Sequence, residues 1–175
     1  MVSGIASFVA GVLAWTFVEY VIHAWLSHTF KTFATPFHDV HHSDPRRVFT
    51  IRAWIPVAVT WVGGLVLFGW SAGMIFLTGA VAGFVAYETV HYRIHFSEPR
   101  TGFERHLRSR HLVHHYRAPN ACFGVTTELW DLVFGSEIMG DEMRQMEASV
   151  AATAPLEGPT NVRRLLYLGF HARGL

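Results

Sequence analysis

Charged residues and cysteine are both scarce in this sequence of 175 residues. Only 15% of the residues are charged, whereas soluble domains average about 25%, so a domain surrounded by water is not expected. The single cysteine, Cys122, excludes an internal disulfide, a CxxC redox pair and a cluster of thiolate ligands. A net charge of only +1 argues against a nucleic-acid partner bound through a basic surface.

The first apolar stretch predicts a membrane span near the N-terminus. Residues 2–26 contain one acid, Glu19, and one histidine, His23. The stretch is about as long as the roughly 20 apolar residues that cross a bilayer as a helix. A secretory signal peptide is the alternative, but no basic residue precedes the stretch and no clean small-residue cleavage site ends it.

The second apolar stretch is long enough for two spans. Residues 53–90 carry no charge before Glu88, which predicts a helical hairpin with arms at about 54–70 and 73–95. Glycines at 63, 64, 79 and 83 suit close helix packing in lipid. A buried hairpin inside a soluble protein is the other interpretation.

The basic residues predict an orientation. The segment before Lys31 and the hairpin turn have no lysine or arginine. The fourteen basic residues are Lys31, Arg46, Arg47, Arg52 and those from Arg93 onward. Because basic loops stay in the cytoplasm, the N-terminus and the hairpin turn are expected outside, and the segment 27–52 and everything after residue 95 inside.

These features predict an all-α, multi-pass membrane protein with about three spans and a cytoplasmic helical cap. The polar region 97–139 is expected to complete the cap, so that residues 1–139 form one membrane-embedded domain. Residues 140–175 contain an acidic helical piece, a Pro/Gly-containing linker and an apolar end with arginines. They are expected to form a tail with a possible surface helix.

Histidine is abundant, with twelve residues, and ten of them fall into four clusters. The clusters are His23 and His28; His38, His41 and His42; His91 and His95; and His111, His114 and His115. His106 and His171 stand outside the clusters, and a single histidine near a helix end is usually a cap or a hydrogen-bonded surface residue. In the predicted topology all four clusters meet at the boundary between membrane and cytoplasm, which indicates a metal site.

The spacing of the histidines predicts two neighbouring metal ions. Residues three or four apart share one face of a helix, whereas adjacent residues differ by about 100°. Each HxxHH pair of adjacent histidines is therefore expected to be divided between two ions. His23 and His28 are five apart, or about 140° on an α-helix, which suits either different ions or a helix that frays at its end.

The ligand type narrows the choice of metal. Ten neutral imidazoles exceed the four ligands of a structural zinc site, and the HExxH motif is absent. Imidazole suits zinc, copper, iron and nickel. Two irons that activate dioxygen fit best because iron changes oxidation state and zinc does not. Copper remains open from the ligands alone, and overexpressed protein can carry zinc.

The clusters, their order and their surroundings resemble the fatty acid hydroxylase / sterol desaturase superfamily of membrane di-iron enzymes. They are most similar to its fatty acid 2-hydroxylase branch. The resemblance covers residues 19–135, and its segments read EYVIHAWLSH, HDVHHSDP, YETVHYRIHF, LRSRHLVHHY and FGVTTELWDLVFG. It implies that all ten clustered histidines bind two iron ions and that O2 is the co-substrate.

The resemblance also implies a reaction and its partners. One oxygen atom of O2 is inserted into a C–H bond of a lipid chain, most simply a fatty acyl chain, at the cytoplasmic membrane face. The same apparatus serves desaturation, and a carotenoid, sterol or aminolipid substrate is the alternative. Relatives usually have an additional span or two, and some carry a fused cytochrome b5 domain. A separate electron donor, such as cytochrome b5 or a ferredoxin, is expected here.

Carboxylates near the clusters are candidates to accept the second ring N–H of a metal-bound histidine. They are Glu19, Asp39, Glu88, Glu128 and Asp131. Arg46, Arg47, Arg108 and Arg110 are expected to meet anionic lipid head groups or solvent, or to dock an acidic electron donor.

Two functions of other classes compete with a di-iron enzyme. A membrane cytochrome with bis-histidine haem would place paired histidines within facing spans, and a metal transporter would place polar ligands at mid-membrane depth. The clusters instead lie at the predicted cytoplasmic ends of the spans.

Overall fold

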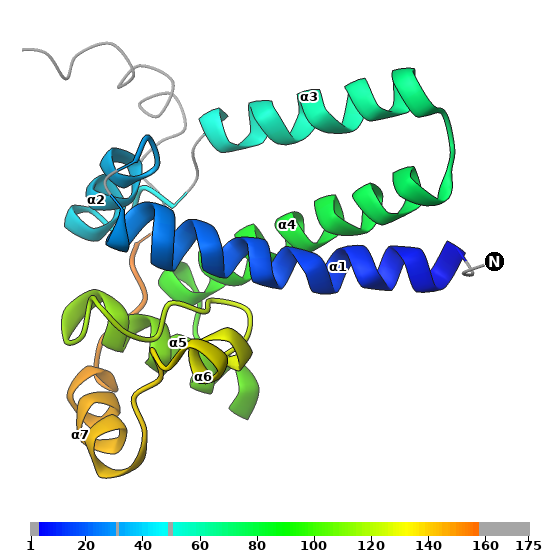
Figure 1. Ribbon diagram of the computed structural model, residues 1–175. Coiled ribbons are helices and arrows are strands. Elements are labelled where there is room, and N and C mark those ends of the chain that lie inside the picture. Colours follow the sequence, from blue (N-terminus) through cyan, green and yellow to red (C-terminus); the bar gives the residue numbers. More distant parts are fainter. Residues whose placement is uncertain (1–3, 31, 49–50, 158–175) are drawn as a thin grey trace, which may run out of the picture.

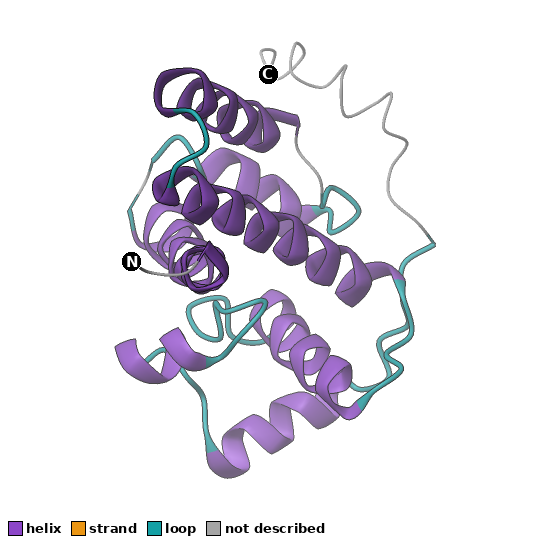
Figure 2. Cartoon of the chain, turned by 90° about the vertical axis from the view of Figure 1, so that its right-hand side faces the viewer, coloured by secondary structure: helices purple, strands orange, loops and turns teal. Residues whose placement is uncertain are grey.

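The computed structural model describes residues 4–30, 32–48 and 51–157, and within these ranges all regular structure is helical (Figure 2). The elements are α1 (Gly4–Tyr20), the π-helix η1 (Val21–Thr29), α2 (Thr35–Ser43), α3 (Ile51–Phe68), α4 (Ala72–Phe96), α5 (Gly102–Tyr116), α6 (Leu129–Phe134) and α7 (Gly140–Val150). The prediction of an all-α fold is confirmed. His171 and the apolar C-terminal end lie outside the described residues.

Two helices in the described ranges are long and apolar enough to cross a membrane. They are the continuous helix Gly4–Thr29, of 26 residues, and α4, of 25 residues. The apolar part of α3, Ala53–Phe68, is shorter and extends roughly 24 Å at 1.5 Å per residue. The expected three apolar helices are therefore present, two of them at spanning length.

The connection between α3 and α4 is a minimal turn. Gly69 adopts the left-handed conformation, with φ of +56°, which glycine allows without a steric penalty. The Ser71 hydroxyl then caps α4 by accepting a hydrogen bond from the Met74 amide at 3.3 Å. In Figure 1 this turn lies at the same end of the molecule as the N-terminus, and α2, α5, α6 and α7 lie at the opposite end.

Helices α1 and α4 are in backbone contact because glycines line their interface. A Cβ atom on Gly79 would lie 2.1 Å from the Phe8 carbonyl oxygen, and one on Gly11 would lie 2.0 Å from the Phe76 oxygen. Gly83 similarly faces Trp15. Two of the four glycines expected to allow close helix packing, Gly79 and Gly83, thus face α1, since only a residue without Cβ allows so close an approach.

The cap has its own apolar core, to which α7 contributes. Its buried members are Leu112, Val113, Cys122, Met143 and Val150. Beyond α7, the Leu156 amide donates to the His95 carbonyl at 2.8 Å, and Arg108 donates to the Thr153 carbonyl at 2.8 Å. The described part of the expected tail therefore packs against the cap.

The α1–α4 contact predicts opposite effects for two Gly→Ala substitutions. In Gly79→Ala the new methyl group meets a backbone carbonyl that cannot move without shifting α1, so we expect destabilisation of at least about 1–3 kcal/mol. Gly63→Ala is the matched control because, apart from its own stretch of helix backbone, no atom of the described residues lies within 4 Å of its Cβ position, and alanine is favoured over glycine in helices. Thermal unfolding in detergent compares the two, and equal melting temperatures would contradict the close contact.

Candidate metal centre

Ten histidines form two groups of five, and within each group one ring nitrogen per residue lies within 4.8 Å of all the others. The first group is His23, His28, His38, His42 and His114. The second group is His41, His91, His95, His111 and His115. The adjacent pairs of both HxxHH segments are divided between the groups, in the way the helical spacing predicted.

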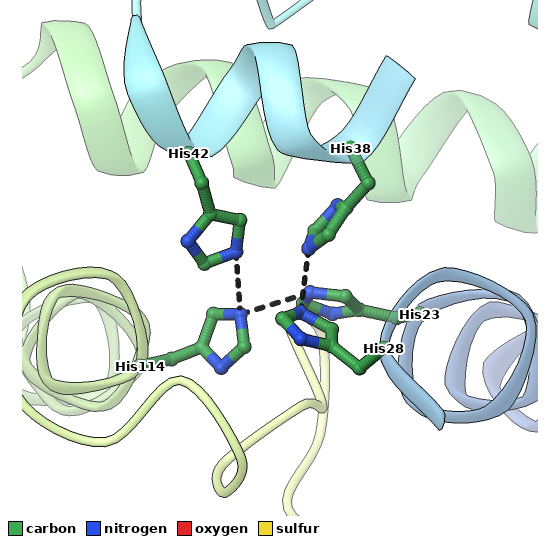
Figure 3. Close-up of side chains that lie close together, drawn as sticks. All are labelled: His23, His28, His38, His42 and His114. Carbon is green, nitrogen blue, oxygen red and sulfur yellow. Dashed lines mark hydrogen bonds between the residues drawn. The ribbon is translucent and has the colours of Figure 1, made fainter. Parts of the chain in front are cut away.

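Separate elements bring each group together. In Figure 3, α2 supplies His38 and His42, α5 supplies His114, and η1 supplies His23 and His28, with all five rings directed at a common centre. The second group combines α2, α4 and α5. The two groups are neighbours, because the rings of His42 and His115 stack with centroids 4.3 Å apart.

The π-helix corrects one expectation from the sequence. His23 and His28 belong to the same group, whereas α-helical spacing suggested different ions or a frayed end. In a π-helix each amide bonds to the carbonyl five residues earlier, as Phe30 does to Trp25 at 2.7 Å. Residues five apart consequently point the same way, and helix distortions of this kind are frequent at functional sites.

Two backbone carbonyls fix the tautomers of two rings in the first group. Nδ1 of His23 lies 2.5 Å from the Phe123 oxygen, and Nδ1 of His114 lies 2.9 Å from the Ala121 oxygen. A carbonyl oxygen only accepts, so in the neutral rings both Nδ1 atoms carry the hydrogen and both Nε2 atoms present lone pairs. These Nε2 atoms nevertheless face each other at 3.1 Å. Two facing lone pairs repel unless a cation lies beside them.

The other nitrogen separations fit metal coordination as well. Nε2 of His42 lies 3.0 Å from that of His114, and Nε2 of His91 lies 3.0 Å from that of His41. Imidazole ligands about 2.1 Å from an ion and at right angles to each other would be about 3.0 Å apart. Both ring nitrogens of His115 are buried and find no hydrogen-bond partner among the residues that the structure describes. The donor set therefore fits a pair of metal ions.

The rings outside the apolar helices are held in their neutral, metal-binding form. Burial, with a further contribution from neighbouring imidazoles, lowers the pKa of each ring well below its usual value. This applies to His38, His41, His111, His114 and His115. Neutral imidazole is the form that binds metals, so no deprotonation is needed at pH 7.

The loop that carries the two acceptor carbonyls, residues 121–126, is fixed by hydrogen bonds to consecutive amides. Asp131 accepts from the amides of Phe123 and Gly124, both at 2.8 Å. Glu19 accepts from the amides of Val125 and Thr126 at 2.8 and 2.9 Å, and from the Thr126 hydroxyl at 2.6 Å. The Cys122 amide donates to the Ser136 carbonyl at 3.0 Å.

The five candidate carboxylates thus have different surroundings. Glu19 and Asp131 bind the loop backbone, and no ring nitrogen is among their hydrogen-bond partners in the described residues. Glu128 pairs with His106 at 2.8 Å, outside both groups. Asp39 is exposed, and its negative charge partly offsets the lowering of the His42 pKa by burial. Glu88 is buried, and within the described part of the chain its Oε2 atom has no hydrogen-bond partner.

Comparison with known proteins identifies the chain's relatives. A model of the fatty acid hydroxylase family matches residues 8–136. The chain belongs to the fatty acid hydroxylase family. It is 32% identical over 157 residues to fatty acid 2-hydroxylase of Mus musculus, covering 82% of this chain and 42% of the relative. It is 34% identical over 137 residues to dihydroceramide fatty acyl 2-hydroxylase FAH2 of Arabidopsis thaliana, covering 72% and 58%.

The fold is also similar to that of a solved structure. Full-length scs7p, of which only the hydroxylase domain is visible, matches with a TM-score of 0.66 and 30% identity. The match covers 88% of this chain and 59% of the other. The chain therefore spans about half the length of the family members that it matches.

Two arginines of the chain are buried, contrary to the expectation from the sequence. Arg108 and Arg110 were expected at lipid head groups, in solvent or at a docking site, but both are buried. Arg108 donates to the carbonyls of Ile94 and Thr153. Arg110, fully buried, pairs with Asp131 at 3.0 Å and with Glu137. Charge alone gave no signal that these side chains stabilise the cap from within.

The buried pair of Arg110 and Asp131 predicts a large loss of stability in Arg110→Met. This change leaves a fully buried carboxylate without its cation, which typically destabilises by about 3–5 kcal/mol. Arg144→Met is the matched control because Arg144 forms an exposed pair with Asp141, and exposed pairs contribute roughly 0–1 kcal/mol. Chemical unfolding of both variants measures the difference, and a similar small effect of both would contradict a structural role for Arg110.

Proposed function

We propose that this chain binds two iron ions through its ten clustered histidines and hydroxylates a lipid chain with O2 at the cytoplasmic membrane face. The observation that carries the proposal is the convergence of Nε2 lone pairs in two adjacent groups of five neutral rings. The names of the relatives, fatty acid 2-hydroxylase and dihydroceramide fatty acyl 2-hydroxylase, favour an acyl chain as substrate.

The ligand sets suit iron that works with oxygen. Each group offers five nitrogen donors and, among the described residues, neither includes a sulfur or a carboxylate, which would leave a bound iron ion room for an oxygen ligand. When bound, the iron pair supplies the activation of O2 that inserts one oxygen atom into an unactivated C–H bond. The chain itself fixes the rings: Phe123 and Ala121 hold the hydrogens of His23 and His114 on Nδ1 and keep Nε2 free.

Apolar surface next to the site supports delivery of the substrate from the bilayer. Helix α6 exposes Leu132 and Val133, with exposed fractions of 50% and 59%. It lies beside α1, the first part of the spanning-length helix Gly4–Thr29, because the Trp130 indole donates to the Thr16 hydroxyl at 3.0 Å. In the described part of the chain His28, His38 and His42 are half-buried. An acyl chain would approach along this surface with its head group in water.

The proposed orientation follows from the charges and the helix ends. The N-terminal end of α1 and the α3–α4 turn share one end of the molecule (Figure 1), and neither carries a lysine or arginine. The cap at the other end carries basic residues, which favours its position in the cytoplasm. We infer a partner that delivers electrons to this cytoplasmic end, of the cytochrome b5 or ferredoxin type.

The geometry argues against bis-histidine haem. A haem iron of that kind takes one imidazole on each face of a flat macrocycle, whereas here five ring nitrogens lie within 4.8 Å of one another. No room remains between these nitrogens for a porphyrin. A desaturase, or a hydroxylase of a carotenoid, sterol or aminolipid, would use the same site. The product that it forms distinguishes it from the proposed acyl-chain hydroxylase.

Lipid mass spectrometry of cells expressing His114→Ala tests the function. The wild-type protein should yield a lipid heavier by one oxygen atom, a gain of about 16 mass units, whereas His114→Ala should yield none because the first ion loses a ligand. His106→Ala is the matched control, since His106 lies outside both groups and pairs with Glu128.

The product mass also separates the alternatives. A loss of about 2 mass units would identify a desaturase with the same apparatus. Product formed by His114→Ala, in protein that still accumulates in membranes, would contradict the proposed role of the histidines. Loss of product in His106→Ala as well would show that the effect is not specific to the two groups.

A further inference from the structure

The two histidine groups differ in how their outer ring nitrogens are held. In the first group, Nδ1 of His23 and of His114 each donates to a backbone carbonyl. In the second group, Nδ1 of His91, His111 and His115 is buried and has no hydrogen-bond partner in the described residues. The partner of the second nitrogen orients a metal-bound imidazole and raises its basicity, so this difference bears on how tightly each group holds an ion.

The loop 121–126 that supplies the two carbonyls is itself immobilised. Five consecutive amides, from Cys122 to Thr126, each donate to a fixed acceptor. The loop also packs tightly on itself at Gly124, because a Cβ atom there would lie 1.9 Å from the Thr127 carbonyl oxygen. Asp131 is anchored in turn by buried Arg110. The two carbonyls therefore cannot shift without breaking several hydrogen bonds.

We infer that the two metal sites are unequal, and that Glu19 and Asp131 are positioning residues which make the first site the tighter one. They act through the loop 121–126 on His23 and His114. The inference rests on the proposed function only in taking the histidines as metal ligands. Removal of such an outer partner typically weakens metal binding 10–100-fold, which sets the expected difference between the sites at about tenfold or more.

Titration of the metal-free protein with Zn²⁺ against a chromophoric chelator tests the inequality without any catalytic readout. The wild-type protein should bind two ions, the first at least about tenfold more tightly than the second. His111→Ala should keep the tight ion and His114→Ala should lose it. Equal affinities in the wild-type protein, or loss of the tight ion in His111→Ala, would overturn the inference.

The two carboxylates predict contrasting behaviour in the same titration. Both oxygens of Asp131 accept from a backbone amide, so Asp131→Asn places an N–H group against a donor and should weaken the tight site about 10–100-fold. In Glu19→Gln one oxygen still accepts from the Val125 and Thr126 amides, and the Thr126 hydroxyl can accept instead of donate. This conservative variant should retain the tight site, whereas Glu19→Ala removes the acceptor of both amides and should weaken the tight site about 10–100-fold. An unchanged tight site in Glu19→Ala would overturn the role of Glu19.

Asp141→Asn, at an exposed position paired only with Arg144 among the described contacts, is the matched control and should leave both affinities unchanged. Equal weakening of both sites in Asp131→Asn would overturn the positioning role. If that variant fails to fold, the wild-type, His111→Ala and His114→Ala titrations still decide the inequality. Equal sites in a protein that makes the lipid product would overturn this inference alone, whereas unequal sites without product would overturn the proposed function alone.

Discussion

The main physical constraint on this structure is that it brings imidazole lone pairs together, so that their repulsion must be offset. His23 and His114 each give their hydrogen to a carbonyl, which leaves two lone pairs facing each other at 3.1 Å. A folded protein tolerates such an arrangement where a cation offsets it. The helices, the loop 121–126 and the buried arginines all serve to hold the rings in these positions, which indicates that the architecture is built around metal ions.

Close packing of the apolar helices brings the ligands to one end of the molecule. Backbone contact through Gly11 and Gly79 locks α1 against α4, so the histidines that follow α1 and those that end α4 emerge side by side. The cap then contributes α2 and α5, each of which reaches both groups. A metal pair shared among four segments, as proposed, would stabilise the cap on the apolar helices as well as supply reactivity.

The sequence predicted features that depend on local spacing. Helical periodicity was enough to divide His41 from His42, and the long uncharged stretch 53–90 was enough to predict a helical hairpin with arms at about 54–70 and 73–95. It did not predict the π-helix, because i,i+5 hydrogen bonds compete closely with i,i+4 bonds and tertiary contacts decide between them. It also could not predict that backbone carbonyls, rather than carboxylates, accept from His23 and His114, since every residue type carries a carbonyl.

The peptide loop between the carboxylates and the rings has an electrostatic consequence. A carboxylate bound directly to each imidazole would bring negative charge close to the ions, whereas Phe123 and Ala121 offer only neutral oxygens. Asp131 is further compensated by Arg110. Two divalent ions held by ten neutral rings, as proposed, would therefore keep most of their positive charge, and in a buried site this charge would act strongly. Such ions would favour additional oxygen ligands that gain negative charge, which supports the proposed activation of O2.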